Sequence, residues 1–96
     1  MNQDFEYQAQ AALDQLEAEL ESAGADFEQK GDGLIEILLD DDSKVIVNRH
    51  SAAREIWVAA RSGAFHYRWD GGGWRNTRDG SELFESIRKL LAAPGG

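Results

Sequence analysis

The sequence predicts an α+β fold, a two-layer sandwich in which two terminal helices pack on one face of a five- to six-stranded antiparallel sheet. Amphipathic segments with apolar residues every three or four positions stand at both ends of the chain. Between them, short runs rich in β-branched and aromatic residues alternate with turns built from Gly, Asp and Ser. Both helices need an apolar surface for their stripes, and one face of the sheet supplies it, so the other face is left open to solvent.

The first helix is predicted over residues 4–23, with Asp4 as its N-cap and Gly24 at its end. Its apolar residues form one stripe: Phe5, Ala9, Ala12, Leu13, Leu16, Leu20 and Ala23. Three carboxylates at i, i+3 and i+7 line one flank of the helix: Asp14, Glu17 and Glu21. No Lys or Arg at i+4 neutralises them, and like charges at this spacing cost about 0.2–0.5 kcal/mol per pair. A row of uncompensated carboxylates therefore indicates a functional role, because it does not stabilise the helix.

Six short strands, each ended by a turn, are predicted after this helix, at residues 26–28, 34–39, 44–48, 55–59, 64–69 and 74–76. Ser81 is then expected to cap a last helix. The apolar stripe of that helix comprises Leu83, Phe84, Ile87, Leu90 and Leu91, and the helix ends before Pro94-Gly95-Gly96. With 96 residues, no internal repeat and no linker, residues 1–96 are expected to form a single domain.

The strand at residues 55–59 contains the most informative side chain. Its alternation places Ile56 and Val58 in the core, which leaves Trp57 pointing toward solvent beside Glu55. A tryptophan among polar neighbours on an open sheet face is well suited to anchor a partner protein. The other large aromatic residues of the strands are expected in the core: Tyr67, Trp69 and Trp74.

Charge is segregated along the chain. Residues 1–42 hold thirteen Asp and Glu against one Lys, a net −12, whereas residues 43–96 hold five acids against nine Lys and Arg, a net +4. An acidic surface repels nucleic-acid phosphate and attracts cations or a basic protein surface. The simpler alternative is that the acidic residues keep a small domain in solution.

Several classes of chemistry and location find no support in the sequence. Cysteine is absent, which excludes disulfides, thiolate nucleophiles and zinc–sulfur sites. No apolar run reaches the length of a membrane span, and the acidic start lacks the features of a signal or transit peptide, so we expect a bacterial cytoplasmic protein. The segment 40–44 does not match a calcium loop, because Lys44 occupies the fifth ligand position.

Catalytic chemistry has little support either. No Ser or Thr stands in a strand-to-helix elbow near a His and a buried acid, so the chain is not expected to be an enzyme. His50 and His66 could share the open face with Trp57, where Glu55 would complete a transition-metal site. The alternative, which the lack of a second acidic neighbour favours, is two solvated histidines with no ligand role.

An ordered set of motifs resembles the frataxin family, in its bacterial CyaY-type branch. The motifs are Asn48-Arg49 after a β-branched run, Ile56-Trp57, Ser62-Gly63, Tyr67-x-Trp69, Trp74 and Asp79-Gly80. The resemblance runs from about Leu13 to Leu91. It implies a helix–sheet–helix fold, which agrees with the pattern of the residues. Glu55 and the segment 50–52 depart from the family, which has Gln and Gln-x-Pro there.

The resemblance also implies a function: a non-enzymatic, iron-handling regulator of iron–sulfur cluster assembly. An acidic ridge would bind iron and the basic surface of the cysteine desulfurase, and the open sheet face would meet the desulfurase and the scaffold protein. Carried over by position, the metal ligands are Asp14, Glu17, Glu21, Asp26 and Glu28. The partner-binding residues are Glu17, Glu21, Asn48, Glu55 and Trp57.

Iron binding by such a ridge is expected to be weak and poorly selective between Fe2+ and Fe3+. Carboxylates spread along a helix flank offer one or two ligands per ion, and water fills the remaining positions. The chain is expected to be a monomer without iron. Two alternatives remain: an acidic protein-interaction module of the same fold without a physiological metal role, and an intrinsic ferroxidase, which would need a closed site.

Overall fold

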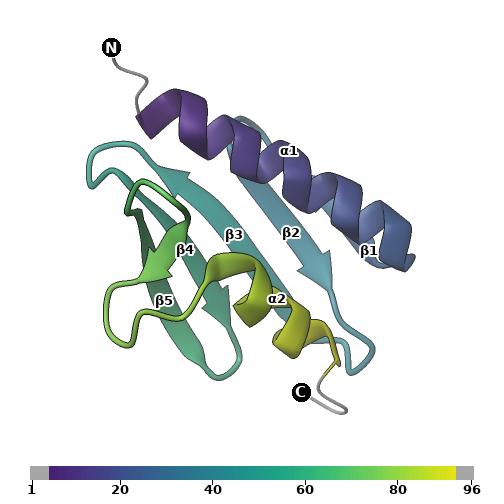
Figure 1. The fold of residues 1–96 in the computed structure, drawn as a ribbon. Coiled ribbons are helices and arrows are strands. Elements are labelled where there is room, and N and C mark those ends of the chain that lie inside the picture. The colour runs from purple at the N-terminus through teal and green to yellow at the C-terminus, as the bar shows by residue number, and fades with distance from the viewer. Residues whose placement is uncertain (1–4, 93–96) are drawn as a thin grey trace.

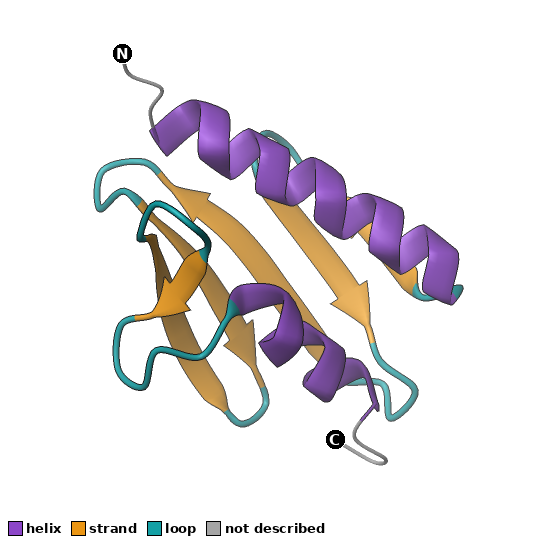
Figure 2. Ribbon diagram, viewed as in Figure 1, coloured by secondary structure: helices purple, strands orange, loops and turns teal. Residues whose placement is uncertain are grey.

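The computed structural model describes residues 5–92, and Figures 1 and 2 show two helices on the same side of a single sheet. The elements follow the predicted order: α1 (Phe5–Ala23), β1 (Asp26–Gln29), β2 (Leu34–Leu38), β3 (Lys44–His50), β4 (Glu55–Ala60), β5 (Gly63–Trp69), β6 (Trp74–Asn76) and α2 (Leu83–Ala92). The six strands pair only with their neighbours in sequence, in the order β1-β2-β3-β4-β5-β6, and every pair is antiparallel. The predicted α+β sandwich is confirmed.

Helix α1 buries the predicted apolar stripe except for Ala23, which is exposed at the last turn. Gly24 adopts a φ of 71°, a left-handed conformation that glycine reaches without a Cβ clash. There the Ala25 N–H donates to the Leu20 carbonyl oxygen at 3.0 Å, and the Gly24 N–H donates to the Glu21 carbonyl oxygen at 3.1 Å. This pair of bonds ends the helix as predicted. The proposed cap, Asp4, lies outside the described residues.

The start of α2 differs from the prediction, which made Ser81 the N-cap. The Glu82 Oε1 atom accepts a hydrogen bond from the Glu85 N–H at 2.9 Å, so Glu82 is the capping residue. Asp79 Oδ1 accepts from both the backbone N–H and the hydroxyl of Ser81, at 2.9 and 2.6 Å. The Ser81 hydroxyl is therefore engaged in the preceding turn. The Pro94-Gly95-Gly96 stop lies outside the described residues.

The core fills the space between the helices and one face of the sheet. Strands β2 to β6 contribute alternate residues to it: Ile35, Ile37, Val45, Val47, Ile56, Val58, Tyr67 and Trp74. Helix α2 adds Leu83, Phe84 and Ile87. In the described part of the chain, no helix is long and apolar enough to cross a membrane. The burial pattern confirms that β4 has the predicted register.

Trp69 is the one large aromatic residue whose predicted burial is wrong, because 40% of its surface is exposed. Trp69 and Trp74 stand opposite each other as the last pair of the β5–β6 ladder, so their side chains share one face. Trp74 packs edge-on against Phe5 of α1, at a centroid distance of 5.9 Å, and takes the buried position. Trp69 packs against Trp74 at 5.6 Å and is left at the rim.

Candidate functional site

The side chains that point away from both helices form the open face of the sheet. Trp57 lies near its centre, because β4 pairs with β3 on one side and β5 on the other. In register, Trp57 stands opposite Asn48 on β3 and opposite His66 on β5. The structure therefore places Asn48 and Trp57 side by side on the face that the alternation predicted.

Two histidines sandwich the indole of Trp57. The imidazole of His50 stacks on one side, with a centroid distance of 3.8 Å and an interplanar angle of 8°. That of His66 stacks on the other side, at 4.6 Å and 11°. We refer to His50, Trp57 and His66 as the aromatic stack. Because imidazoles cover both ring faces, Trp57 is half-buried rather than fully exposed, and its ring edge is the part left to solvent.

Glu55 holds this stack from within the sheet surface. It lies on the predicted face but is only 7% exposed. Its carboxylate accepts hydrogen bonds from the Trp57 Nε1–H at 2.7 Å and from the Arg68 Nε–H at 2.8 Å, and its Oε1 lies 3.3 Å from His66 Nδ1. A buried carboxylate with these donors fixes the orientation of the indole.

The environment of Glu55 shifts its titration. Burial acts to raise the pKa of Glu55, but the hydrogen bonds from Trp57 and Arg68 and the charges of Arg68 and His66 outweigh it. The pKa of the Glu55 carboxyl in the folded protein is therefore lower than its ordinary value. The ionised form stabilises the fold above the unfolded pKa of about 4.3, and this contribution is lost as the pH falls through the folded pKa.

We therefore expect Glu55→Gln to be less stable than the wild type at pH 7, and the difference to shrink as the pH is lowered below about 4. Urea denaturation at pH 7, 5 and 3 measures the difference in the free energy of unfolding between the variant and the wild type. Glu21→Gln, which changes an exposed glutamate of α1, is the matched control for the loss of one negative charge. A stability difference for Glu55→Gln that is the same at every pH would show that the pKa of Glu55 is the same in the folded and unfolded states.

A shared transition-metal site of His50, His66 and Glu55 does not form. The indole of Trp57 lies between the two imidazoles, so one ion cannot reach both. The Nδ1 atom of His50 accepts the Ala53 N–H at 3.2 Å. Within residues 5–92, no three or more His, Cys, Asp or Glu side chains are grouped so that they could hold a metal ion.

The five carboxylates of the predicted ridge lie in two groups. Asp14, Glu17 and Glu21 follow one flank of α1, and none of them makes an ion pair with a described residue. Asp26 and Glu28 lie on β1, on the open face, because their neighbour Phe27 packs toward the core. The first group thus lies on a helix, and the second lies on the open face of the sheet.

Two further charged residues belong to these surfaces and were not predicted from the sequence. Glu36 stands opposite Glu28 in the β1–β2 register and lies 3.4 Å from Lys30 and 3.6 Å from Lys44. Alternation along β2 would have identified it. Glu19, on the other flank of α1, binds Arg88 of α2 with two hydrogen bonds of 3.1 and 2.7 Å. These bonds lower the pKa of Glu19 and tie the two helices together.

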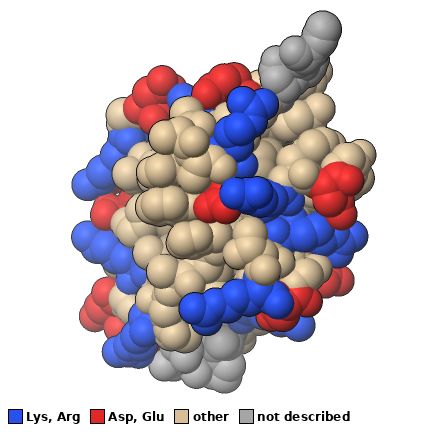
Figure 3. Space-filling model, turned by 90° about the vertical axis from the view of Figure 1, so that its left-hand side faces the viewer, with Lys and Arg blue, Asp and Glu red and all other residues tan. Residues whose placement is uncertain are grey.

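Basic residues are numerous on one side of the molecule. Figure 3, which shows the side that lies on the left of Figure 1, has more Lys and Arg than Asp and Glu. Six arginines of the second half of the chain are exposed: Arg54, Arg61, Arg68, Arg75, Arg78 and Arg88. Charge segregation along the sequence is only partly kept in space, because Lys44, Arg49, Arg61 and Arg88 pair with carboxylates of the first half of the chain. The row Asp14, Glu17 and Glu21 on α1 makes no ion pair with a described residue.

Comparison with known proteins points to the same family as the sequence motifs, the frataxin family. The family model described as "Frataxin-like domain" matches residues 1–95. The iron-sulfur cluster assembly protein CyaY of Dechloromonas aromatica (strain RCB) is 50% identical over 95 residues, which cover 97% of this chain and 90% of that protein. The protein of the same name from Janthinobacterium sp. (strain Marseille) is 43% identical, with coverages of 97% and 88%.

The fold agrees with a solved structure as well. A frataxin from Psychromonas ingrahamii superposes with a TM-score of 0.73 at 28% sequence identity, covering 86% of this chain and 80% of the other. Sequence motifs, fold and family match thus concur over nearly the whole chain. The chain belongs to the frataxin family, as a CyaY-type frataxin-like domain.

Proposed function

We propose that this protein is a non-enzymatic regulator of iron–sulfur cluster assembly in the bacterial cytoplasm that binds the cysteine desulfurase and its scaffold protein. The observation that carries this proposal is the row of carboxylates on α1, Asp14, Glu17 and Glu21, without ion-pair partners among the described residues. Such a row complements a basic protein surface, accelerates association and weakens with salt. The 50% identity to a CyaY protein supports the same role.

The open face supplies the second contact in this proposal. Trp57 presents its ring edge, and Asn48 presents an amide beside it. Glu55 and the two stacked histidines hold the indole in one orientation, so little side-chain entropy remains to be lost on binding. Glu55 therefore acts through Trp57, as a positioning residue, rather than by touching the partner.

Iron would bind to the ridge weakly. The carboxylates of the ridge lie in two sets, one on α1 and one on β1. Each ion would be bound by one or two carboxylates, and water would fill its remaining coordination positions. We expect binding that is poorly selective and sensitive to salt, with more than one ion per chain. Carboxylate oxygens are hard ligands, and they bind Fe2+, Fe3+ and other metal ions alike.

The double substitution Glu17→Lys and Glu21→Lys tests the proposal. We expect it to weaken binding to the host's cysteine desulfurase strongly at low salt and to leave the fold intact, because both side chains flank the buried stripe. The loss should shrink as salt rises, since charges are screened over about 8–10 Å at physiological ionic strength. A pull-down at two salt concentrations measures the effect. Glu85→Lys, on the exposed side of α2, is the control.

Equal binding by the double variant and the wild type at low salt would contradict the ridge proposal. The second candidate, an interaction module without a metal role, is favoured by the lack of any three-ligand cluster in residues 5–92. The two candidates differ in one NMR measurement on the isolated protein. If Fe2+ broadens the backbone amide signals of residues 17 and 21 in the wild type but not in the double variant, the metal role stands. If it broadens them in neither protein, the module remains.

A further inference from the structure

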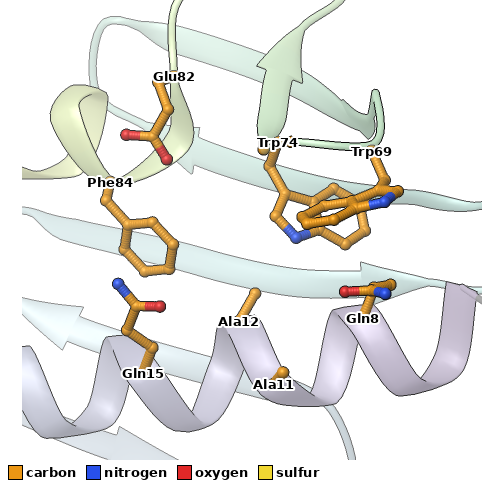
Figure 4. Close-up of a pocket in the computed structure, with 10 residues that line it drawn as sticks. Gln8, Ala11, Ala12, Gln15, Trp69, Trp74, Glu82 and Phe84 are labelled. Atoms are coloured by element: carbon orange, nitrogen blue, oxygen red, sulfur yellow. The ribbon is translucent and has the colours of Figure 1, made fainter.

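Trp69 is exposed at one end of the sheet, where a groove runs along its ring. Figure 1 shows the start of α1, the β3–β4 turn and the β5–β6 hairpin at this same end. The groove has a volume of about 310 Å³ and is lined by Phe5, Ala53, Arg54, Arg68 and Trp69. A second groove, of about 290 Å³, lies between α1 and the β5–β6 hairpin and also has Trp69 in its wall (Figure 4). Trp69 is therefore a wall that two grooves share.

Arg54 lies in an unusual backbone conformation at this groove. Its φ is 57°, in the left-handed region that Gly, Asn and Asp occupy most readily. Its N–H donates to the Ser51 carbonyl oxygen at 3.1 Å and closes the turn between β3 and β4. The Cβ atom of any residue other than glycine approaches the following carbonyl oxygen in this conformation, so the backbone is strained here. Strained residues of this kind cluster at binding sites.

The side chain of Arg54 has no ion pair or hydrogen bond with any described residue, and it is exposed. The other arginine of the groove, Arg68, binds Glu55 through its Nε–H and is 64% exposed at its side chain. Among residues 5–92, no carboxylate lines the groove, and the remaining lining residues are apolar. The groove thus pairs guanidinium groups with an exposed indole.

We infer that this groove binds an acidic peptide segment of a partner protein, in which a carboxylate meets Arg54 and a neighbouring apolar side chain packs on Trp69. Guanidinium groups bind carboxylates with paired, charge-assisted hydrogen bonds, and an exposed indole supplies apolar contact area. The site goes beyond the proposed function, because it contains neither the ridge carboxylates nor Trp57. The ligand of this groove would be negatively charged, whereas the carboxylates of the ridge would bind cations or a basic protein surface.

A single-stranded nucleic acid also offers anions beside stacking surfaces. The charge of the chain argues against it. The protein carries a net charge of −8, and a polyphosphate that extends beyond the groove would meet a repulsive field. An acidic segment of a protein can place its carboxylates at the groove and continue outside it with uncharged residues, which a nucleic acid cannot do, so the peptide is the better match.

The test is an NMR titration of the full-length 15N-labelled protein with the peptide acetyl-Glu-Glu-Leu-Glu-Glu-amide. We expect shifts of the Trp69 indole N–H and of residues 53 and 54, and an affinity that falls with salt. Arg54→Gln should weaken binding about tenfold, because a charge-assisted contact is lost. Trp69→Phe, which keeps an aromatic ring at the rim, should weaken binding less than Arg54→Gln does. Arg61→Gln, which changes an exposed arginine in the β4–β5 turn, is the matched control and should change the affinity less than about twofold.

Three results would overturn the inference. The first is equal binding by Arg54→Gln and the wild type. The second is equal binding of the uncharged peptide acetyl-Gln-Gln-Leu-Gln-Gln-amide, which would remove the role of charge. The third is tighter binding of a five-nucleotide oligo-dT than of the acidic peptide, which would make the groove a nucleic-acid site. Because Arg54 is exposed, its substitution leaves the core in place, and an unchanged amide spectrum outside the groove verifies this.

Discussion

Trp74→Ala is expected to destabilise this protein by about 3–5 kcal/mol. Trp74 is 2% exposed and contacts Phe5 of α1 edge-on, so its removal leaves a large cavity between β6 and the first helix. The total stability of a domain is about 5–15 kcal/mol, so this loss leaves little of it. Urea denaturation, followed by far-UV circular dichroism, measures the change in the free energy of unfolding.

Trp69→Ala is the matched control, because the two tryptophans face each other in the same ladder. Trp69 is 40% exposed, so its truncation removes less buried area and should cost well under half as much. The alternation of β5 alone predicts a similarly large cost for Trp69→Ala, since it places Trp69 in the core. Equal destabilisation by the two substitutions would mean that Trp69 is buried as deeply as Trp74.

Trp57→Ala is expected to weaken the complex with the cysteine desulfurase or the scaffold protein by about 2 kcal/mol, which is roughly thirtyfold in affinity. The indole lies at the centre of the open face, where anchoring residues dominate binding energy. Isothermal titration calorimetry with each purified partner measures the loss. The isolated variant should remain folded, because the core-facing residues of β4, Ile56 and Val58, are unchanged.

Trp57→Phe separates the two contributions of this residue. Phenylalanine keeps a ring between His50 and His66 but removes the Nε1–H that Glu55 accepts at 2.7 Å. We expect an affinity between those of the wild type and Trp57→Ala. Wild-type affinity in Trp57→Ala, with both partners, would remove Trp57 from the interface. The acidic ridge would then have to carry the binding without it.

Much of this architecture could be predicted from the sequence because it depends on periodicity. A 3.6-residue repeat of apolar side chains determined α1 and α2, and a two-residue alternation determined which face of each strand is buried. These rules placed Ile56 and Val58 in the core and Trp57 beside Asn48 on the open face. Gly24 ended α1 because a left-handed residue was needed there.

Depth of burial depended on neighbours that are not local in sequence, and capping depended on hydrogen bonds that residue type alone does not predict. Ser81 is the better cap by residue type, but it bonds to Asp79, and the carboxylate of Glu82 caps the helix instead. Alternation treats Tyr67 and Trp69 alike, but Tyr67 is 1% exposed and Trp69 lies at the rim because Trp74 occupies the buried position.

The sequence by itself determined the fold, the open face and the row of carboxylates on α1, because each follows from spacing along one element. The tertiary structure alone decided the aromatic stack, since it joins β3, β4 and β5, and it alone buried Glu55 among Trp57, His66 and Arg68. The physical reason is that spacing decides the direction in which a side chain points. How far that side chain is buried, and which groups it meets, depend on side chains that other strands bring beside it.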